Sequence, residues 1–149
     1  MERRSIFIVL LLILNTLSWR VQAQCEASVI EAYNTQCLEK IKPLGFNFLK
    51  NYKLDGQGGN KRVIEVSYVF STGTTYVIAV ANAHAENKGL AITLFDAQRN
   101  KVASSFIEDK KVYYPAIQLE CKKTGIYYIS FSFVDTKEFC GGAVLGFKR

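Results

Sequence analysis

The sequence predicts a mainly β protein, a single β-sandwich of about eight antiparallel strands with one N-terminal amphipathic helix. Three observations support this fold class. Short runs rich in valine, isoleucine, tyrosine and phenylalanine recur with a period of two residues. Turn-forming residues separate these runs at regular intervals, as in sandwiches and barrels. A helical period occurs before Pro43, ahead of all the strand patterns, so alternating α/β units are not expected.

Residues 1–23 have the pattern of an export signal. Arg3 and Arg4 give a basic start, residues 6–14 are an unbroken apolar run, and small residues precede Gln24. A membrane-spanning helix would need roughly 20 apolar residues, which is far more than this run provides. We therefore expect the signal to be removed and the mature chain to be periplasmic or extracellular.

The charge of the chain argues against nucleic acid as a partner. The 19 basic and 13 acidic residues give a formal charge of +6, which falls to +4 without the signal because three of the basic residues and one acid lie there. The remaining cations are scattered as pairs such as Lys110-Lys111 and Lys122-Lys123, next to acidic residues. Scattered pairs are typical of solvated loop ends rather than of a nucleic-acid-binding stripe.

All four cysteines follow the signal, and a small exported domain with an even number of cysteines normally oxidises them. On one continuous helix Cys25 and Cys37 would lie roughly 18 Å apart, whereas a disulfide needs Cα atoms within about 7 Å. The preferred pair is Cys121 with Cys140, and the partners of Cys25 and Cys37 stay open. Acylation of Cys25 in a lipoprotein is disfavoured, because Gln24 is a poor match to the small residue that precedes such a cysteine.

Residues 24–45 are expected to form the N-terminal helix and its exit turn. Between Glu26 and Lys42 apolar residues recur every three or four positions, and Pro43 ends the helical pattern. The apolar stripe predicts a helix packed on the sheet of its own domain; its members are Val29, Ile30, Tyr33, Cys37, Leu38 and Ile41.

Residues 46–149 are expected to form the sandwich domain. Alternation predicts a strand up to Leu54, with Phe46, Phe48 and Tyr52 on the same face, and a hairpin of 64–70 with 76–80 across the turn 71–74. Further strands are predicted at 89–95, 101–107, 112–120, 126–134 and 143–147. Pro115 lies inside one of them and predicts an edge strand or a bulge, since it cannot donate to the ladder.

The segment KLDGQGGNKR, residues 53–62, resembles a ligand-binding loop in composition but fits no complete template. An EF-hand starting at Asp55 would lack its later oxygen ligands, and a phosphate loop would need glycine directly before the lysine. We interpret it as a connector between two strands. Asp55 is a very weak candidate for a cation; no metal or other cofactor is expected.

The segment Thr124–Ile129 predicts one core face and one outer face. Alternation sends Tyr127 and the aromatic residues that follow it inward, and Tyr128, Ser130 and Ser132 outward. The outward side chains are weak candidates for binding a carbohydrate, although tyrosine is also a common strand former.

Several motifs resemble those of bacterial pre-peptidase C-terminal-like domains. They are GLAITLFD at 89–96, KVAS at 101–104 and TGIYYI at 124–129, in that order. The whole chain also resembles a group of small exported bacterial proteins of unknown function, with a Cys-Gly-Gly segment like that at Cys140. The resemblance implies a jelly-roll sandwich over residues 63–148, of a kind that commonly accompanies secreted peptidases or binds other macromolecules.

The sequence provides no recognisable catalytic set. His84 is its single histidine, in a polar segment without a nucleophile motif, and no zinc spacing is present. The sequence therefore favours an exported non-enzymatic module with a binding or structural role at the bacterial envelope, with a polysaccharide or an envelope protein as partner. The alternatives are a small-ligand carrier with an interior cavity and, less favoured, a secreted hydrolase.

Overall fold

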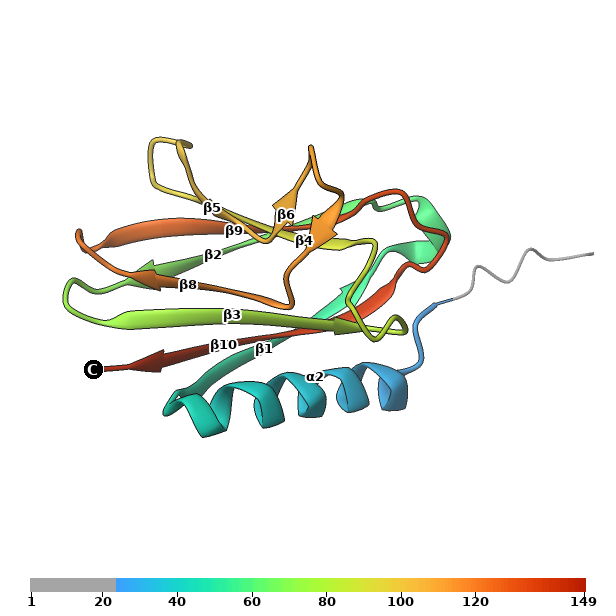
Figure 1. Cartoon of the computed structure of the whole chain (residues 1–149), viewed down its shortest axis with the longest axis horizontal. Helices are drawn as coiled ribbons and strands as arrows, with labels where there is room; N and C mark the ends of the chain where they lie inside the picture. The colour runs from blue at the N-terminus through green and yellow to red at the C-terminus, as the bar shows by residue number, and fades with distance from the viewer. Residues whose placement is uncertain (1–23) are drawn as a thin grey trace, which may run out of the picture.

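The computed structural model describes residues 24–149, which form a jelly-roll sandwich with one helix on its outside (Figure 1). The predicted signal, residues 1–23, lies outside the described residues. The elements in chain order are α2 (Ala27–Ile41), η1 (Lys42–Leu44), β1 (Asn47–Asp55), η2 (Gln57–Gly59), β2 (Val63–Phe70), β3 (Thr75–Asn82), β4 (Leu90–Phe95), β5 (Lys101–Ser104), β6 (Phe106–Ile107), β7 (Val112–Tyr113), β8 (Ala116–Glu120), β9 (Gly125–Phe133) and β10 (Cys140–Lys148).

The strands form two four-stranded antiparallel sheets and one small hairpin. The first sheet has the order β1-β10-β3-β8, the second has the order β2-β9-β4-β5, and β6 pairs with β7. Counted over the eight strands of the two large sheets, the order is 1-8-3-6 over 2-7-4-5, which is that of a jelly roll. The predicted fold class is therefore confirmed.

Aromatic and branched side chains fill the space between the two sheets. Phe70 of one sheet stacks on Tyr76 of the other with ring centroids 4.0 Å apart, and on Tyr127 at 4.8 Å. Phe131 and Phe133 are buried in the same cluster. Because these rings occupy the interior, the alternative of a carrier with an interior cavity is not supported.

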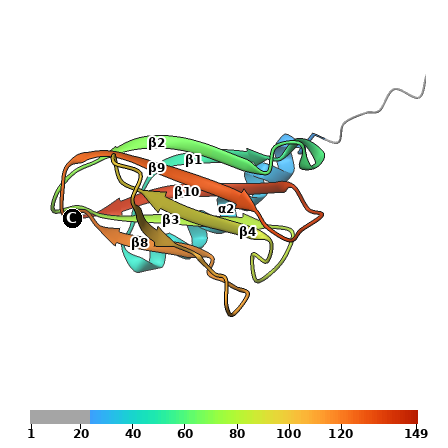
Figure 2. The ribbon, with the colours of Figure 1, turned by 90° about the horizontal axis from the view of Figure 1, so that it is seen from above.

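The helix α2 covers the outer face of the first sheet and leaves the second sheet uncovered (Figures 1 and 2). Ile30, Cys37 and Ile41 are buried against this sheet, as the apolar stripe predicts. Val29 also belongs to the predicted stripe but is exposed. The helix contacts the sheet through the residues in line with Cys37, and Val29 lies to one side of that line. Gly142 on β10 leaves room for the helix backbone at its closest approach.

The predicted hairpin of residues 64–70 with 76–80 is wrong. β2 pairs with β9 and β3 pairs with β10 and β8, so the turn at 71–74 carries the chain from one sheet to the other. β2 partly buries alternate residues on the inner face of its sheet, whereas β3 is buried on both faces, by the sandwich core on one side and by α2 on the other. Phe48 is also half exposed rather than in the core, because β1 is bulged between Phe48 and Lys50.

Two predicted strands are each divided in the structure. Ser105 is fully buried and separates β5 from β6, because its hydroxyl accepts a hydrogen bond from the Ile92 N–H at 2.7 Å. Tyr114 and Pro115 separate β7 from β8, and the Pro115 carbonyl accepts a bond from Val80 at 2.8 Å. As predicted for Pro115, the adjoining strand β8 is an edge strand.

The preferred disulfide between Cys121 and Cys140 is wrong. The structure joins Cys25 to Cys140 and leaves Cys37 and Cys121 as buried free thiols. The chain brings the residues before α2 to the start of β10, whereas Cys121 lies between β8 and β9 at the other end of the sandwich (Figure 1). The bond also occupies the Cys25 sulfur, which excludes its acylation in the same molecule.

Within residues 24–149 no helix has both the length and the apolar character needed to cross a membrane.

Candidate functional site

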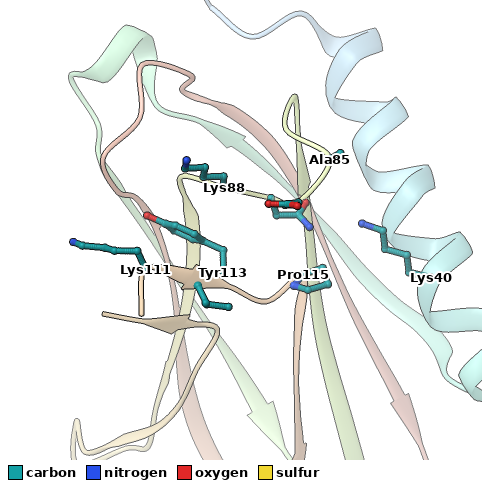
Figure 3. Close-up of a pocket in the computed structure, with 9 residues that line it drawn as sticks. Lys40, Ala85, Lys88, Lys111, Tyr113 and Pro115 are labelled. Atoms are coloured by element: carbon teal, nitrogen blue, oxygen red, sulfur yellow. The ribbon is translucent and has the colours of Figure 1, made fainter. Parts of the chain in front are cut away.

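A surface groove of about 530 Å³ lies between α2, the β3–β4 loop and the hairpin of β6 with β7 (Figure 3). Its lining residues are Lys40, Ala85, Glu86, Asn87, Lys88, Lys111, Val112, Tyr113 and Pro115. Three separate elements therefore build it: the helix on the first sheet, the loop that joins β3 to β4, and the hairpin, whose strand β6 contacts β4 of the second sheet.

Three lysines border the groove. Lys88 and Lys111 lie on either side of the Tyr113 ring, and Lys40 points in from the last turn of α2 on the opposite side (Figure 3). Lys111 contacts Asp135 at 3.5 Å, with both groups exposed. Within the described residues neither Lys40 nor Lys88 forms an ion pair. Since Glu86 is the single acid in the lining, the groove has a positive balance of charge suited to a carboxylate or another anion.

Tyr113 holds the hairpin side of the groove in place. Its ring stacks on Phe106 with centroids 4.5 Å apart, and its hydroxyl donates to the Val134 carbonyl at 3.3 Å. Partial burial raises the pKa of Tyr113, and the charge of Asp135 raises it further. The Tyr113 hydroxyl therefore stays protonated at neutral pH and serves as a fixed donor.

Asn87 is the one buried residue in the lining of the groove. It is 2% exposed and has a left-handed backbone with φ of 51°. Its N–H donates to the His84 carbonyl, and its carbonyl accepts from Leu90, so the loop is a closed turn rather than a free tip. The lysine that follows it is thereby directed into the groove.

A smaller hollow of about 270 Å³ lies on the other side of the same loop. His84, Gly89, Asp135, Thr136, Lys137 and Glu138 line it, together with Lys88, which also borders the groove. The single histidine therefore lines the same hollow as two carboxylates, Asp135 and Glu138, an arrangement that the sequence does not indicate. All of these residues are on loops, and the structure brings no nucleophile of a Ser-His-Asp type to them.

The outward-facing candidates Tyr128, Ser130 and Ser132 lie on the uncovered face of the second sheet, as predicted. The guanidinium of Arg99 stacks on the Tyr128 ring at 3.7 Å and bonds to Glu65 at 2.8 Å. The ring face that would stack on a sugar is thus occupied. Ser130 is buried between its neighbouring strands, so these residues do not form an open sugar-binding surface.

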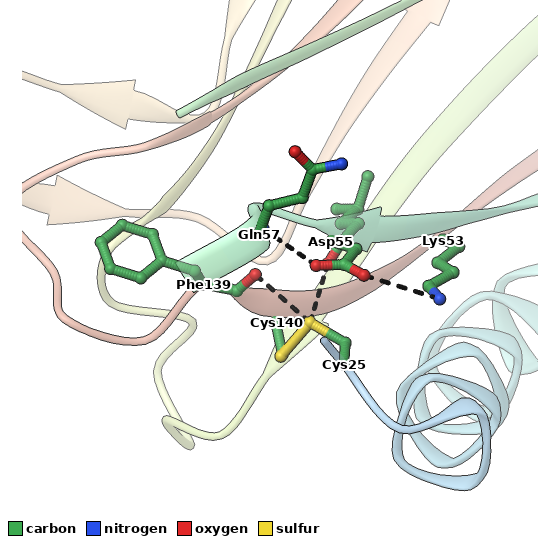
Figure 4. A network of polar contacts seen from close by, with 7 residues as sticks. Cys25, Lys53, Asp55, Gln57, Phe139 and Cys140 are labelled. Atoms are coloured by element: carbon green, nitrogen blue, oxygen red, sulfur yellow. Dashed lines mark hydrogen bonds and ion pairs between the residues drawn. A yellow bond between two sulfur atoms is a disulfide. The ribbon is translucent and has the colours of Figure 1, made fainter. Parts of the chain in front are cut away.

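The loop of residues 53–62 packs against the rest of the sandwich beside the disulfide (Figure 4). Asp55 accepts from the Gln57 N–H at 2.9 Å and pairs with Lys53 at 3.6 Å, so both of its oxygens have contacts. The Gly56 N–H donates to the Phe139 carbonyl at 2.8 Å. These contacts account for Asp55 without a cation and confirm that the segment connects two strands.

Across the part of the chain that the structure describes, no group of three or more histidine, cysteine, aspartate or glutamate side chains is placed to hold a metal ion.

Comparison with known proteins gives matches to solved structures but none to a family or a sequence. No protein-family model and no curated protein sequence matches the chain. Nine chains of solved structures match it, among them Aeromonas hydrophila PliG, a periplasmic lysozyme inhibitor of g-type lysozyme. That match has 10% sequence identity and a TM-score of 0.46, and covers 69% of this chain and 86% of the other. A likeness at this level carries no argument about function.

Sequence reasoning missed the groove because its residues come from three segments far apart in the chain. Lys40 belongs to the helix, Lys88 to a loop and Lys111 to a hairpin. The basic pair Lys110-Lys111 was visible in the sequence, but isolated lysines are common at solvated loop ends. The three lysines come together at one groove because of the strand order, and no local pattern in the sequence predicts that order.

Proposed function

We propose that the protein is an exported, non-enzymatic binding module that recognises an acidic surface of an envelope protein through the groove. The observation that carries the proposal is the lysine border around Tyr113. Two of these lysines have no ion pair within the described chain. A groove with this balance of charge favours carboxylates by direct attraction and by faster association.

Export is supported by the disulfide as well as by the signal pattern. Cys25 and Cys140 are 115 residues apart in sequence and are joined in the structure. Such bonds persist in the periplasm and outside the cell and are rare in the cytosol. The site of action that fits both observations is the cell envelope.

A protein partner fits the surface better than a polysaccharide. Sugar recognition commonly uses an exposed aromatic face, but Arg99 covers Tyr128 and Phe106 stacks on Tyr113. A charged groove rimmed by flexible lysines instead suits the acidic side chains of a protein. Membership of the pre-peptidase C-terminal-like family remains a prediction from the sequence motifs.

The proposal is tested by reversing the charge of the groove. The double variant Lys40→Glu/Lys88→Glu should lose envelope proteins that the wild type retains in affinity capture from envelope extract at low salt. The matched control, Lys61→Glu/Lys101→Glu, changes the net charge equally at exposed lysines away from the groove, and it should retain them. Retention by the wild type should weaken as salt rises, because the screening length shortens.

Three outcomes would contradict this assignment. Equal loss in both double variants would show that net charge, not the groove, controls retention. Binding to a panel of neutral polysaccharides without any protein partner would replace the partner class. Hydrolase turnover that His84→Ala abolishes would show that the hollow beside the groove is an active site.

A further inference from the structure

The edge strand β2 lacks the bulge, proline and lysine that often keep an edge from pairing with another chain, and its one charged side chain, Glu65, is paired with Arg99. It runs in register with β9 over all eight residues from Val63 to Phe70, without a bulge. Its sequence, VIEVSYVF, contains no proline and no lysine. Natural edge strands are usually protected by short length, bulges, prolines or lysines.

The other three edge strands carry these features. β1 is bulged between Phe48 and Lys50 and also carries Lys53. β8 has five residues and directly follows Pro115. β5 has four residues, begins with Lys101, and pairs irregularly with β4. Because three edges of the same sandwich are protected and β2 is not, its free side is a candidate for pairing.

The backbone groups on that free side belong to the odd-numbered residues. The Phe133 N–H donates to the Arg62 carbonyl at 2.8 Å. This bond shows which residues of β2 direct their backbone groups toward β9. In an antiparallel ladder alternate residues turn their backbone groups to opposite sides. Even-numbered residues therefore bond to β9, and residues 63, 65, 67 and 69 present N–H and C=O groups to the free side.

We propose that β2 pairs with β2 of a second copy of the chain, antiparallel and with its two-fold axis at Val66. In this register Val63 lies opposite Val69 of the second copy, and Glu65 lies opposite Ser67. Odd residues meet odd residues, so the free backbone groups face each other. The segment VIEVSYV has the same order of apolar and polar character in both directions, so apolar side chains lie opposite apolar ones and no like charges lie directly opposite each other.

Side-chain exposure agrees with a second copy as the occupant. Val63 and Val69 are 52% and 56% exposed, and pairing would cover both. The inward-facing residues Ile64, Val66 and Tyr68 are half buried, because the space between the edges of the two sheets is open there. A self-complementary segment of this kind is what a two-fold interface requires.

The dimer leaves the groove free. β2 lies at one edge of its sheet, and β5 and the hairpin lie at the opposite side (Figure 2). An interface made by a single edge is small, so the dimer should form in a concentration-dependent manner.

Substitutions at Ser67 with opposite charges test the register. Ser67→Glu places a carboxylate opposite Glu65 of the second copy, twice per dimer, and should weaken the dimer about tenfold. Ser67→Lys places an ammonium group at the same points and should leave the dimer as tight or tighter. Sedimentation equilibrium at low salt over a range of protein concentrations measures both dissociation constants.

Thr72→Glu and Thr72→Lys provide the control, because Thr72 is exposed in the turn after β2 and the changes in net charge are the same. Neither should change the dimer. Circular dichroism and thermal melting confirm that each variant is folded. A wild-type protein that stays monomeric at all concentrations would overturn the proposal. Equal weakening by both Ser67 variants would also overturn it, since a charge of either sign would then simply block the edge.

Discussion

The hydroxyl of Tyr52 is an unpaired polar group in the core, whereas the hydroxyls of Tyr76 and Tyr127 in the same cluster form hydrogen bonds. It is buried between the sheets, and it has no hydrogen-bond partner among the described residues. Burial raises the pKa of Tyr52 to about 12, and the nearby Tyr68 adds to the rise. A buried hydroxyl without a partner costs stability, because it loses its bonds to water on folding.

We predict that Tyr52→Phe raises the free energy of unfolding by about 1 kcal/mol at neutral pH. Between pH 10 and 12 the unfolded tyrosine is ionised while the folded one keeps its proton, so the wild type loses stability as the pH rises. The advantage of the variant should therefore grow over this range. Urea denaturation at a series of pH values measures it, with the exposed Tyr114→Phe as control; a pH-independent difference would contradict the burial of this hydroxyl.

At the residue scale, the sequence predicts which side chains are buried better than it predicts which residues contact each other. Alternation correctly places Tyr127 inward and Tyr128 outward, because side-chain direction in a strand is a local property. It does not show that Arg99 covers Tyr128 or that Cys25 reaches Cys140. Both contacts join residues from different strands or segments and depend on the strand order.

The contact between α2 and β10 depends on the absence of a side chain at Gly142. A Cβ at this position would lie 2.6 Å from the Asn34 amide oxygen and 2.9 Å from the Tyr33 Cβ. The helix would have to move away from the sheet to make room. The small residue thus sets the distance between these two elements.

Gly142→Ala is expected to lower the free energy of unfolding by about 1–3 kcal/mol, which is typical of overpacking in a close contact. Gly125→Ala is the control, because a Cβ there meets nothing within 4 Å and the backbone is not left-handed. The control should be neutral or slightly stabilising, since alanine restricts the unfolded chain. Thermal melts of the two variants compare them directly, and similar losses in both would argue against this close helix contact.

At the element scale, the sequence predicts where the long helix and strands lie in the chain. It does not predict every point where a strand is interrupted, or which strands pair. The helix and β9 are found within one or two residues, because each has a sustained period. The pattern at 101–107 continues through Ser105, and the break there comes from a hydrogen bond to β4. The apparent hairpin of β2 with β3 also fails, because a short turn can join two sheets as readily as two strands of one sheet.

At the scale of the whole molecule, the Cys25–Cys140 disulfide holds the residues just before α2 to the last strand. The bond closes a separation of 115 residues, and beside it Gly56 bonds to Phe139 (Figure 4). Cross-linking so much of the chain restricts the unfolded state strongly in the chain-entropy account. The bond therefore links stability to the redox state of the compartment.

We predict that Cys25→Ser/Cys140→Ser lowers the free energy of unfolding by about 2–5 kcal/mol. Dithiothreitol should destabilise the wild type by a similar amount and leave the double variant unchanged, because Cys37 and Cys121 are not bonded. Denaturation with and without the reductant measures both effects. Peptide mapping without reduction should give a peptide that joins Cys25 to Cys140. A linked peptide containing Cys121, or a double variant still sensitive to the reductant, would show that a different bond stabilises the protein.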